Sequence, residues 1–231
     1  FQQNYSENGI LKVLHGLGLS WQKARPVHPA ADREAQAAFK KTFPALVAGH
    51  GQLRPQVPLE IWFLDESRVG QTGRVCRRWF TKGVRPRGRR DLRHESVHLF
   101  GAVCPVRDTG VALVLPVADT AAMPLMLDEL ANTVTPGAHA LVILDRAGWH
   151  TSRSLRVPAN LTLVFLPPYS PELNAIERVW LYLKERFLSH RLWPTYDDIL
   201  HACCAAWNAL RQEAGRIQSL CSFHWLPQVK I

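Results

Sequence analysis

Three acidic residues stand where their side chains could serve as oxygen ligands for metal ions. Asp65 closes the apolar run 59–64, Asp145 closes the apolar run 140–144, and Glu177 opens a helical pattern after a proline-rich turn. Three converging carboxylates bind hard divalent cations through oxygen. Two such ions about 4 Å apart activate an attacking water or hydroxyl and stabilise the leaving oxygen of an in-line phosphoryl transfer. This chemistry needs no nucleophile or general-base histidine from the protein.

Each of the three acids also has a purely structural explanation. An aspartate just after a strand is common as a turn or cap residue. Glu177, with Asn174 as N-cap, matches an Asn-x-x-Glu capping box in front of an apolar helical face. The three acids occur together with the unusual turn 166–174 (LPPYSPELN), and this combination favours a metal-binding site over three separate structural roles. Glu172 within that turn is a rival to Glu177 as the third ligand.

Four further residues near the acids have less specific roles. Glu66 and His150 are interpreted as a surface acid and a loop histidine and not as metal ligands, with a role as supporting or DNA-contacting groups as the alternative. Tyr169 and Trp180 are expected to pack in the core, with base stacking as the alternative.

The elements that must position these acids form an α/β pattern. Apolar, β-branched runs predict strands, and the early ones are expected to pair antiparallel because their connections are too short for crossover helices. The predicted strands are 59–64, 79–81, 96–103, 110–117, 140–144 and 161–166. The predicted helices are 120–132, 175–188 and 196–210, the last capped by Thr195. This order indicates a mixed sheet flanked by helices, with Asp65 and Asp145 at carboxyl ends of strands.

The residues before 59 predict a smaller N-terminal part. Residues 6–17 have helical apolar spacing with Ser6 as N-cap, and the aromatic, basic segment 20–26 is typical of a wing or a phosphate-contacting arm. The alternative is a simple helix packed on the core. A linker follows, and then a helix from 30 to 43 that we expect Pro44 to end. The start at Phe1, without a methionine, predicts a lost N-terminus.

Positive charge dominates the composition and is concentrated in one segment. The 231 residues carry 28 Lys and Arg against 19 Asp and Glu, a net charge of +9, which favours a polyanionic partner. The basic segment, residues 74–93, is opposed locally only by Asp91. Its predicted phosphate-binding residues are Arg74, Arg77, Arg78, Lys82, Arg85, Arg87, Arg89, Arg90 and Arg93, and Lys12, Lys23 and Arg25 are predicted to add N-terminal DNA contacts.

Hydropathy and cysteine usage exclude two classes of protein. Hydrophobic residues make up 47% of the chain. No apolar run approaches the length of about 18 residues that spans a bilayer, so we expect a soluble protein without membrane contact. The five cysteines show no CxxC or Cys/His ligand spacing, which argues against a disulfide framework or a zinc site and favours the cytoplasm.

The acidic motifs resemble those of a known family. Residues 63–67 (FLDES), 144–145 (LD) with 150–152 (HTS), and above all 166–184 (LPPYSPELNAIERVWLYLK) resemble DDE transposases of the mariner superfamily, in particular the bacterial insertion-sequence branch called the six-thirty group. Arg146 stands where many members have Asn, and the interval between Asp145 and Glu177 is slightly shorter than usual. The resemblance spans nearly the whole chain.

The resemblance implies a fold, a domain order and a set of ligands. It implies an RNase H-like catalytic domain over 59–231, a linker and connecting helix over 27–58, and the C-terminal part of a winged helix-turn-helix domain over 1–26. Asp65, Asp145 and Glu177 become the catalytic metal ligands, and Glu177 is selected over Glu172. Two Mg²⁺ or Mn²⁺ ions are implied as cofactors.

The resemblance also implies what the protein acts on. Cleavage at transposon terminal inverted repeats and strand transfer into double-stranded target DNA at a TA dinucleotide are expected, by a homodimer in the bacterial cytoplasm associated with the nucleoid. The basic segment corresponds to a loop that in relatives bridges DNA ends and the partner subunit. The alternatives are an RNase H-fold nuclease without strand transfer and a catalytically inactive, DNA-binding remnant of a transposase.

Overall fold

The computed structural model describes residues 6–20, 28–72, 82–83, 91–152 and 154–227. The chain divides into two compact units, Phe1–Ala31 and Asp32–Ile231. The predicted strand 79–81 and the N-terminal residues Lys23 and Arg25 lie outside the described residues.

The first unit contains one described helix, α1 (Glu7–Gly16). The side chain of Ser6 accepts a hydrogen bond from the backbone N–H of Gly9 at 3.2 Å, which confirms the predicted N-cap. No residue of α1 is buried, and its apolar side chains, Val13 and Leu14 among them, are exposed. Lys12 lies on this helix and is also exposed.

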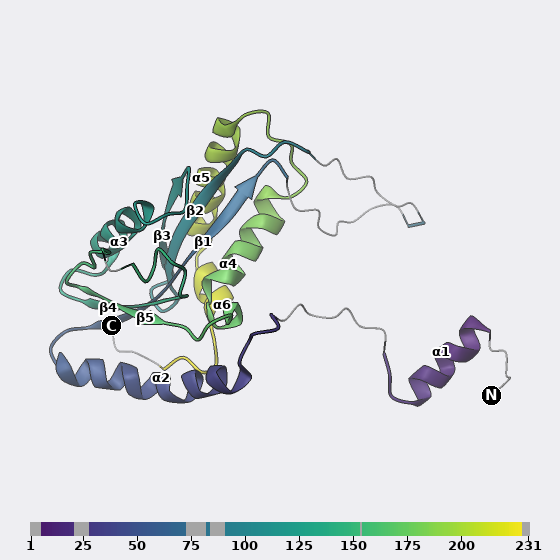
Figure 1. Ribbon diagram of the computed structural model, residues 1–231, viewed down its shortest axis with the longest axis horizontal. Helices are drawn as coiled ribbons and strands as arrows, with labels where there is room; N and C mark the ends of the chain where they lie inside the picture. The colour runs from purple at the N-terminus through teal and green to yellow at the C-terminus, as the bar shows by residue number, and fades with distance from the viewer. Residues whose placement is uncertain (1–5, 21–27, 73–81, 84–90, 153, 228–231) are drawn as a thin grey trace. The chain divides into compact units, whose positions relative to one another are not determined.

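A mixed five-stranded sheet forms the centre of the second unit (Figure 1). Its strands are β1 (Leu59–Gly70), β2 (Ser96–Cys104), β3 (Thr109–Leu115), β4 (His139–Leu144) and β5 (Leu161–Phe165), in the spatial order β3-β2-β1-β4-β5. The first three strands pair antiparallel, as predicted from their short connections, while β4 and β5 run parallel to β1. The predicted mixed sheet is confirmed.

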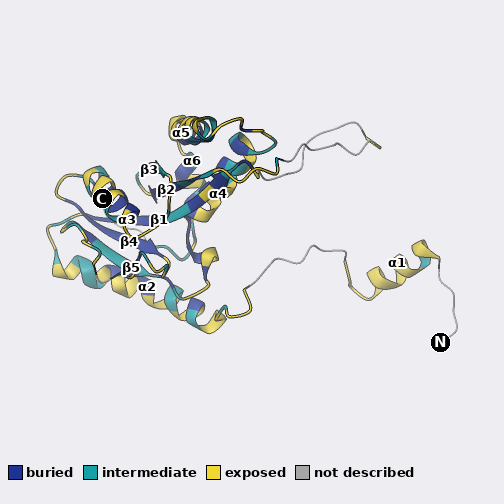
Figure 2. Cartoon of the chain, turned by 45° about the horizontal axis from the view of Figure 1, so that its top comes forward, coloured by how far each residue is buried: buried dark blue, intermediate teal, exposed yellow. Residues whose placement is uncertain are grey.

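Helices cover both faces of this sheet. On one face α3 (Ala122–Thr133) buries an apolar cluster with Trp62 and Leu64 of β1, and on the other face α4 (Ile176–Leu183) and α5 (Tyr196–Gln212) pack with Ile61 and Phe63. This alternation follows from the pleat, which turns successive side chains of a strand to opposite faces. Figure 2 shows the sheet as the buried layer between more exposed helices. The short helix α6 (Arg216–Cys221) completes the second cluster.

The helix α2 (Arg33–Leu53) does not end at Pro44, so that prediction was wrong. A proline inside a helix lacks the N–H donor and costs about 3 kcal/mol. Here Phe43 and Val47, on either side of the proline, are both buried in the core, and Phe43 packs edge-on against Trp225. Tertiary packing therefore keeps the helix continuous across the proline. Asp32 caps its start.

The C-terminal helices agree with the predicted spans. α4 continues as one π-helical stretch, Lys184–Leu188, so that the two together cover the expected 175–188. Thr195 begins α5 in a reciprocal capping box with Asp198. Among the described residues no helix is both long and apolar enough to cross a membrane, and Cys104, Cys203, Cys204 and Cys221 are not in disulfides.

Candidate functional site

The register between β1 and β4 places Asp65 and Asp145 at equivalent positions. The last parallel pair is Phe63 with Ile143, so each aspartate stands two residues beyond it. β1 itself runs on to Gly70, paired only with β2, which corrects the prediction that Asp65 lies at the end of its strand. The strand continues because β2 supplies antiparallel partners after β4 has ended. Asp65 thus lies inside a strand, at the carboxyl edge of the parallel half of the sheet.

Asp65 faces α4 in a poorly solvated position. The indole Nε1 of Trp180 donates a hydrogen bond to Asp65 Oδ2 at 3.0 Å. Burial raises the pKa of Asp65 to about 8, and the negative charges of Glu66 and Glu177 contribute to that rise. Gly101 is the β2 residue paired with Asp65, and a Cβ there would stand 2.6 Å from the Trp180 ring, so only glycine leaves room for this indole.

The turn before α4 is attached directly to β1. The side-chain Nδ2 of Asn174 donates to the backbone oxygen of Leu64 at 2.9 Å, and Asn174 is buried. The alternative explanation of Glu177 as part of a capping box is therefore wrong, since the helix is preceded by Ala175 without a side-chain cap. Asn174 is used for a contact across the fold because Leu64 O has lost its strand neighbour on the β4 side.

Glu177 lies in the first turn of α4 among the other acids. Removal from solvent raises its pKa, Lys184 lowers it, and the charges of Asp145 and Glu66 raise it again. Glu177 of α4 is thus within electrostatic reach of Asp65 in β1 and of Asp145 after β4. Glu172, the rival, lies before this helix in the 3₁₀ turn Pro171–Leu173, and both glutamates are exposed.

Asp145 is held by its own loop and by a buried histidine. Its Oδ1 accepts hydrogen bonds from the backbone N–H of Ala147 at 2.9 Å and from His150 Nδ1 at 2.7 Å. The Nε2 of His150 lies 3.4 Å from Glu66 Oε2. Although burial opposes the charged imidazole, the hydrogen bond to Asp145 and the close contact with the Glu66 carboxylate raise the pKa of His150 to about 9. The bond from His150 is the largest influence lowering the pKa of Asp145.

The donor set suits a hard divalent cation. In the part of the chain that the structure describes, no group of three His, Cys, Asp or Glu side chains is already arranged to hold a metal ion. One oxygen of Asp145 is already bonded to His150. The neighbouring carboxylates repel one another, so without a cation it is electrostatically unfavourable for them to come within ligand distance of a common point. All candidate donors are carboxylate oxygens, which is the ligand type that Mg²⁺ and Mn²⁺ prefer. The triad as metal ligands stays a prediction.

Neighbouring residues of the proline-rich turn divide between core and surface. Trp180 is buried against Trp207, as predicted. Tyr169 is 54% exposed with a left-handed backbone (φ 53°), so its expected place in the core was wrong. The sharp turn directs this side chain outward. Arg146 donates from Nε to the Leu166 oxygen at 3.2 Å and lies over the Phe165 ring.

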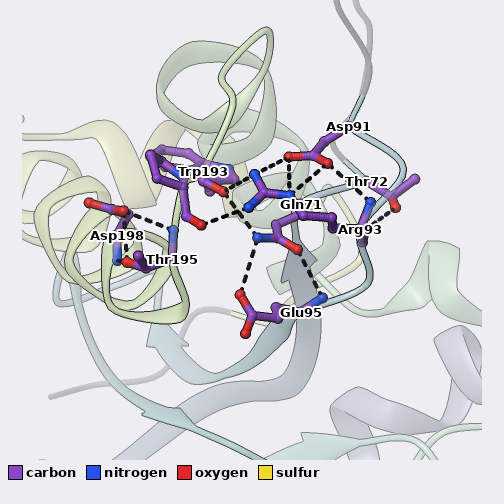
Figure 3. Close-up of polar contacts among 9 residues, drawn as sticks. Gln71, Thr72, Asp91, Arg93, Glu95, Trp193, Thr195 and Asp198 are labelled. Atoms are coloured by element: carbon purple, nitrogen blue, oxygen red, sulfur yellow. Dashed lines mark hydrogen bonds and ion pairs between the residues drawn. The ribbon is translucent and has the colours of Figure 1, made fainter.

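The basic segment begins and ends at the β1–β2 hairpin, where a polar network anchors its base (Figure 3). Gln71 Nε2 donates to Glu95 Oε2 and to the Trp193 oxygen, both at 3.1 Å. Arg93 donates to the Trp193 and Pro194 oxygens at 3.0 and 2.8 Å and pairs with Asp91 at 2.7 Å. The base of the segment is thereby tied to the loop that precedes α5.

Of the nine predicted phosphate-binding residues, the structure describes two. Lys82 is exposed, and Arg93 donates its guanidinium N–H groups to the network above. The remaining seven, Arg74, Arg77, Arg78, Arg85, Arg87, Arg89 and Arg90, lie outside the described residues. Charge density alone does not separate an arginine that holds the loop base from one that contacts phosphate.

The contact between Asn174 and β1 was also missed, because no sequence signal indicated that role of Asn174.

Comparison with known families settles the classification. Residues 60–200 match the family described as DDE superfamily endonuclease. The chain belongs to this family. Residues 1–43 also match the winged helix-turn helix family. The DDE chain is 50% identical over 128 residues to the uncharacterized protein y4pE/y4sA of Sinorhizobium fredii (strain NBRC 101917 / NGR234), a match that covers 55% of this chain and 95% of the relative.

Solved structures share the fold of this DDE chain. A Mos1 transposase paired-end complex with left transposon end superposes with a TM-score of 0.65 at 15% identity, covering 94% of this chain and 66% of that one. The catalytic domain of Mos1 mariner transposase gives 0.50 at 14% identity, with 87% and 100% covered. These matches, with the mixed sheet, confirm the RNase H-like core. The chain spans about two thirds of the length of the first of these transposases.

Proposed function

We propose that this DDE endonuclease is a transposase that cuts DNA at transposon ends and joins the freed 3′-hydroxyl to target DNA. What supports the proposal is that β1, the loop after β4 and the first turn of α4 carry one acid each and place Glu177 within electrostatic reach of both Asp65 and Asp145. The Mos1 structures, which are described as paired-end and strand transfer complexes, support the same reaction class by analogy of fold.

Asp65, Asp145 and Glu177 would hold two divalent cations, Mg²⁺ or Mn²⁺. Bound there, the cations would activate the attacking water or 3′-hydroxyl and stabilise the leaving oxygen. Two Mos1 paired end complexes are described with Mn and with Mg, which supports divalent metal use in this fold. The chain's own contribution is to hold Asp65 through Trp180, Asp145 through His150, and the start of α4 through Asn174.

Double-stranded DNA is the proposed partner, as terminal inverted repeats and as target. Phosphates would bind the basic segment and, in the first unit, Lys12, Lys23 and Arg25. We assign Arg93 to the loop base, because its donors already meet carbonyl and carboxylate oxygens. A homodimer would bring two DNA ends together. Within each chain, DNA recognition would fall to residues 1–26, the connection to residues 27–58 and catalysis to residues 59–231.

One experiment tests the proposal. Labelled duplex DNA carrying the terminal inverted repeats that flank the coding sequence is incubated with the protein, Mg²⁺ and a target plasmid, and wild type is compared with Asp145→Asn. We expect 3′-end cleavage and joined products only with wild type. Cleavage without joining would identify a nuclease. Binding without cleavage by wild type would contradict both enzymatic functions and identify a DNA-binding remnant.

A further inference from the structure

His150 lies between two carboxylates that come from different elements. Its side chain is fully buried, with Nδ1 2.7 Å from Asp145 Oδ1 and Nε2 3.4 Å from Glu66 Oε2. The neighbouring Trp149 ring packs edge-on against the imidazole. Both ring nitrogens therefore point at acids, and packing leaves the ring little rotational freedom.

Glu66 reaches His150 from the face of β1 opposite to Asp65. Ile61, Phe63 and Val69 pack in the cluster beneath α4, so the pleat places Asp65 on that face and Glu66 on the other. The contact from Asp65 to Trp180 of α4 agrees with this assignment. The Glu66 side chain is only 14% exposed. A largely buried carboxylate needs a partner of opposite charge or a donor, and His150 supplies it.

The bond from His150 fixes the plane of the Asp145 carboxylate. Both hydrogen bonds to Asp145 go to Oδ1, one from His150 and one from the backbone N–H of Ala147. Two donors on one oxygen determine the side-chain rotamer of a residue that is otherwise 56% exposed. The second oxygen then keeps one orientation, as a metal ligand requires.

We propose that His150 is a positioning residue which, anchored by Glu66, orients the Asp145 carboxylate for the divalent cation. The inference rests on the proposed metal site, but makes a separate claim: Glu66 is an anchor of the histidine and not a ligand. It also gives the five-residue interval between Asp145 and His150 a physical reason, since the turn at Ala147 returns the chain so that the imidazole meets the carboxylate.

Mn²⁺ binding to the full chain, followed by electron paramagnetic resonance of free Mn²⁺, tests this claim without DNA. His150→Leu removes both contacts, and we expect an affinity weaker by roughly 10- to 100-fold. His150→Asn places an amide N–H near the position of Nδ1, and should stay within about threefold of wild type, as should Glu66→Gln, which keeps an acceptor oxygen. Circular dichroism establishes that each variant is folded at the temperature of the titration.

Each outcome distinguishes the inference from the metal site on which it rests. Wild-type affinity in His150→Leu, with binding abolished in Asp145→Asn, would overturn the positioning role and leave the metal site standing. Loss in Glu66→Gln as large as in Asp145→Asn would make Glu66 a ligand and overturn its role as anchor. Absence of Mn²⁺ binding in the wild type would overturn both. If His150→Leu does not fold, a more than tenfold loss in His150→Asn would refute the proposal.

Discussion

The side-chain amide of Asn174 donates a hydrogen bond to the backbone oxygen of Leu64, 2.9 Å away, one residue before Asp65. This bond joins the turn that begins α4 to the strand that carries the first acid. Asn174 is buried, so the bond is shielded from water and its loss leaves a buried carbonyl without its donor. The relative position of Asp65 and Glu177 depends on it.

Asn174→Ala is expected to lower both stability and cleavage. The buried Leu64 oxygen would lose its donor at a cost of about 1–3 kcal/mol in the free energy of unfolding, measured by urea denaturation. Asn160→Ala is the matched control, because Asn160 Nδ2 also donates to a backbone oxygen, that of Ala131, at 2.9 Å. Neither Asn160 nor Ala131 is one of the acids of the site. Equal cleavage rates for the two variants at a temperature where both are folded would contradict the role of Asn174.

Divalent metal should stabilise the folded chain through the triad. A ligand that binds only the native state adds about 2.7 kcal/mol at 100 times its dissociation constant. We expect Mg²⁺ to raise the melting temperature of wild type and of Glu172→Gln, and to leave Asp145→Asn and Glu177→Gln unchanged. Scanning calorimetry in Mg²⁺ and in chelator gives the comparison. A metal effect lost in Glu172→Gln and kept in Glu177→Gln would reverse the choice of third ligand.

The basic segment should determine how DNA affinity depends on salt. Each phosphate contact contributes about 0.9 to the slope of log affinity against log salt. Arg87→Ala with Arg89→Ala is expected to flatten that slope by about 2 in fluorescence anisotropy titrations. Arg33→Ala with Lys41→Ala, at exposed positions of α2, removes the same charge elsewhere and should leave the slope near that of wild type. A slope unaltered by the first pair would refute phosphate binding by this segment.

Gly101→Ala should disturb the packing next to Asp65. The new methyl group would meet the Trp180 ring at 2.6 Å and Ile176 at 3.3 Å. Overpacking of this kind costs about 1–3 kcal/mol, which denaturation curves measure, and indole fluorescence reports on the displaced Trp180. Gly49→Ala within α2 meets no neighbouring atom and should be neutral or stabilising by up to about 1 kcal/mol. A stable Gly101→Ala variant would mean that Trp180 can move aside at little cost.

His139 should make the fold less stable in mild acid. Burial, followed by the charges of Arg54 and His50, lowers its pKa below the ordinary 6.5, and its Nε2 lies 2.8 Å from Thr162 Oγ1. A lowered pKa means that the unfolded chain binds the proton more tightly than the folded chain. The neutral, buried His139 therefore stabilises the fold above pH 6.5, and this stabilisation is lost as pH falls below 6.5. His139→Gln should reduce the difference in unfolding free energy between pH 7.5 and 5.5. An NMR titration placing the pKa of His139 above its ordinary value would contradict this sign.

Periodicity and strand-end position predicted the elements that carry the acids, but not the contacts between them. The antiparallel pairing of the early strands followed from connection lengths, and Asp65, Asp145 and Glu177 were selected by position and motif. For Asn174 the sequence offered only a local alternative, the Asn-x-x-Glu cap, whereas its actual partner is Leu64, 110 residues away in sequence. Similarly, Pro44 carries a strong local rule for ending helices, and only the burial of Phe43 and Val47 overrides it. Contacts distant in sequence leave no trace in periodicity.

The strand β1 also sets the distance between Asp65 and the base of the basic segment. Asp65 and Gly70 are five residues apart on one strand, and the basic segment begins just beyond Gly70. A strand advances about 3.3 Å per residue, so roughly 17 Å separate the acid from the base of the segment. Duplex DNA rises about 3.4 Å per base pair. Under the proposed function, a duplex laid along β1 would therefore be cut about five base pairs from phosphates bound at the base of the basic segment.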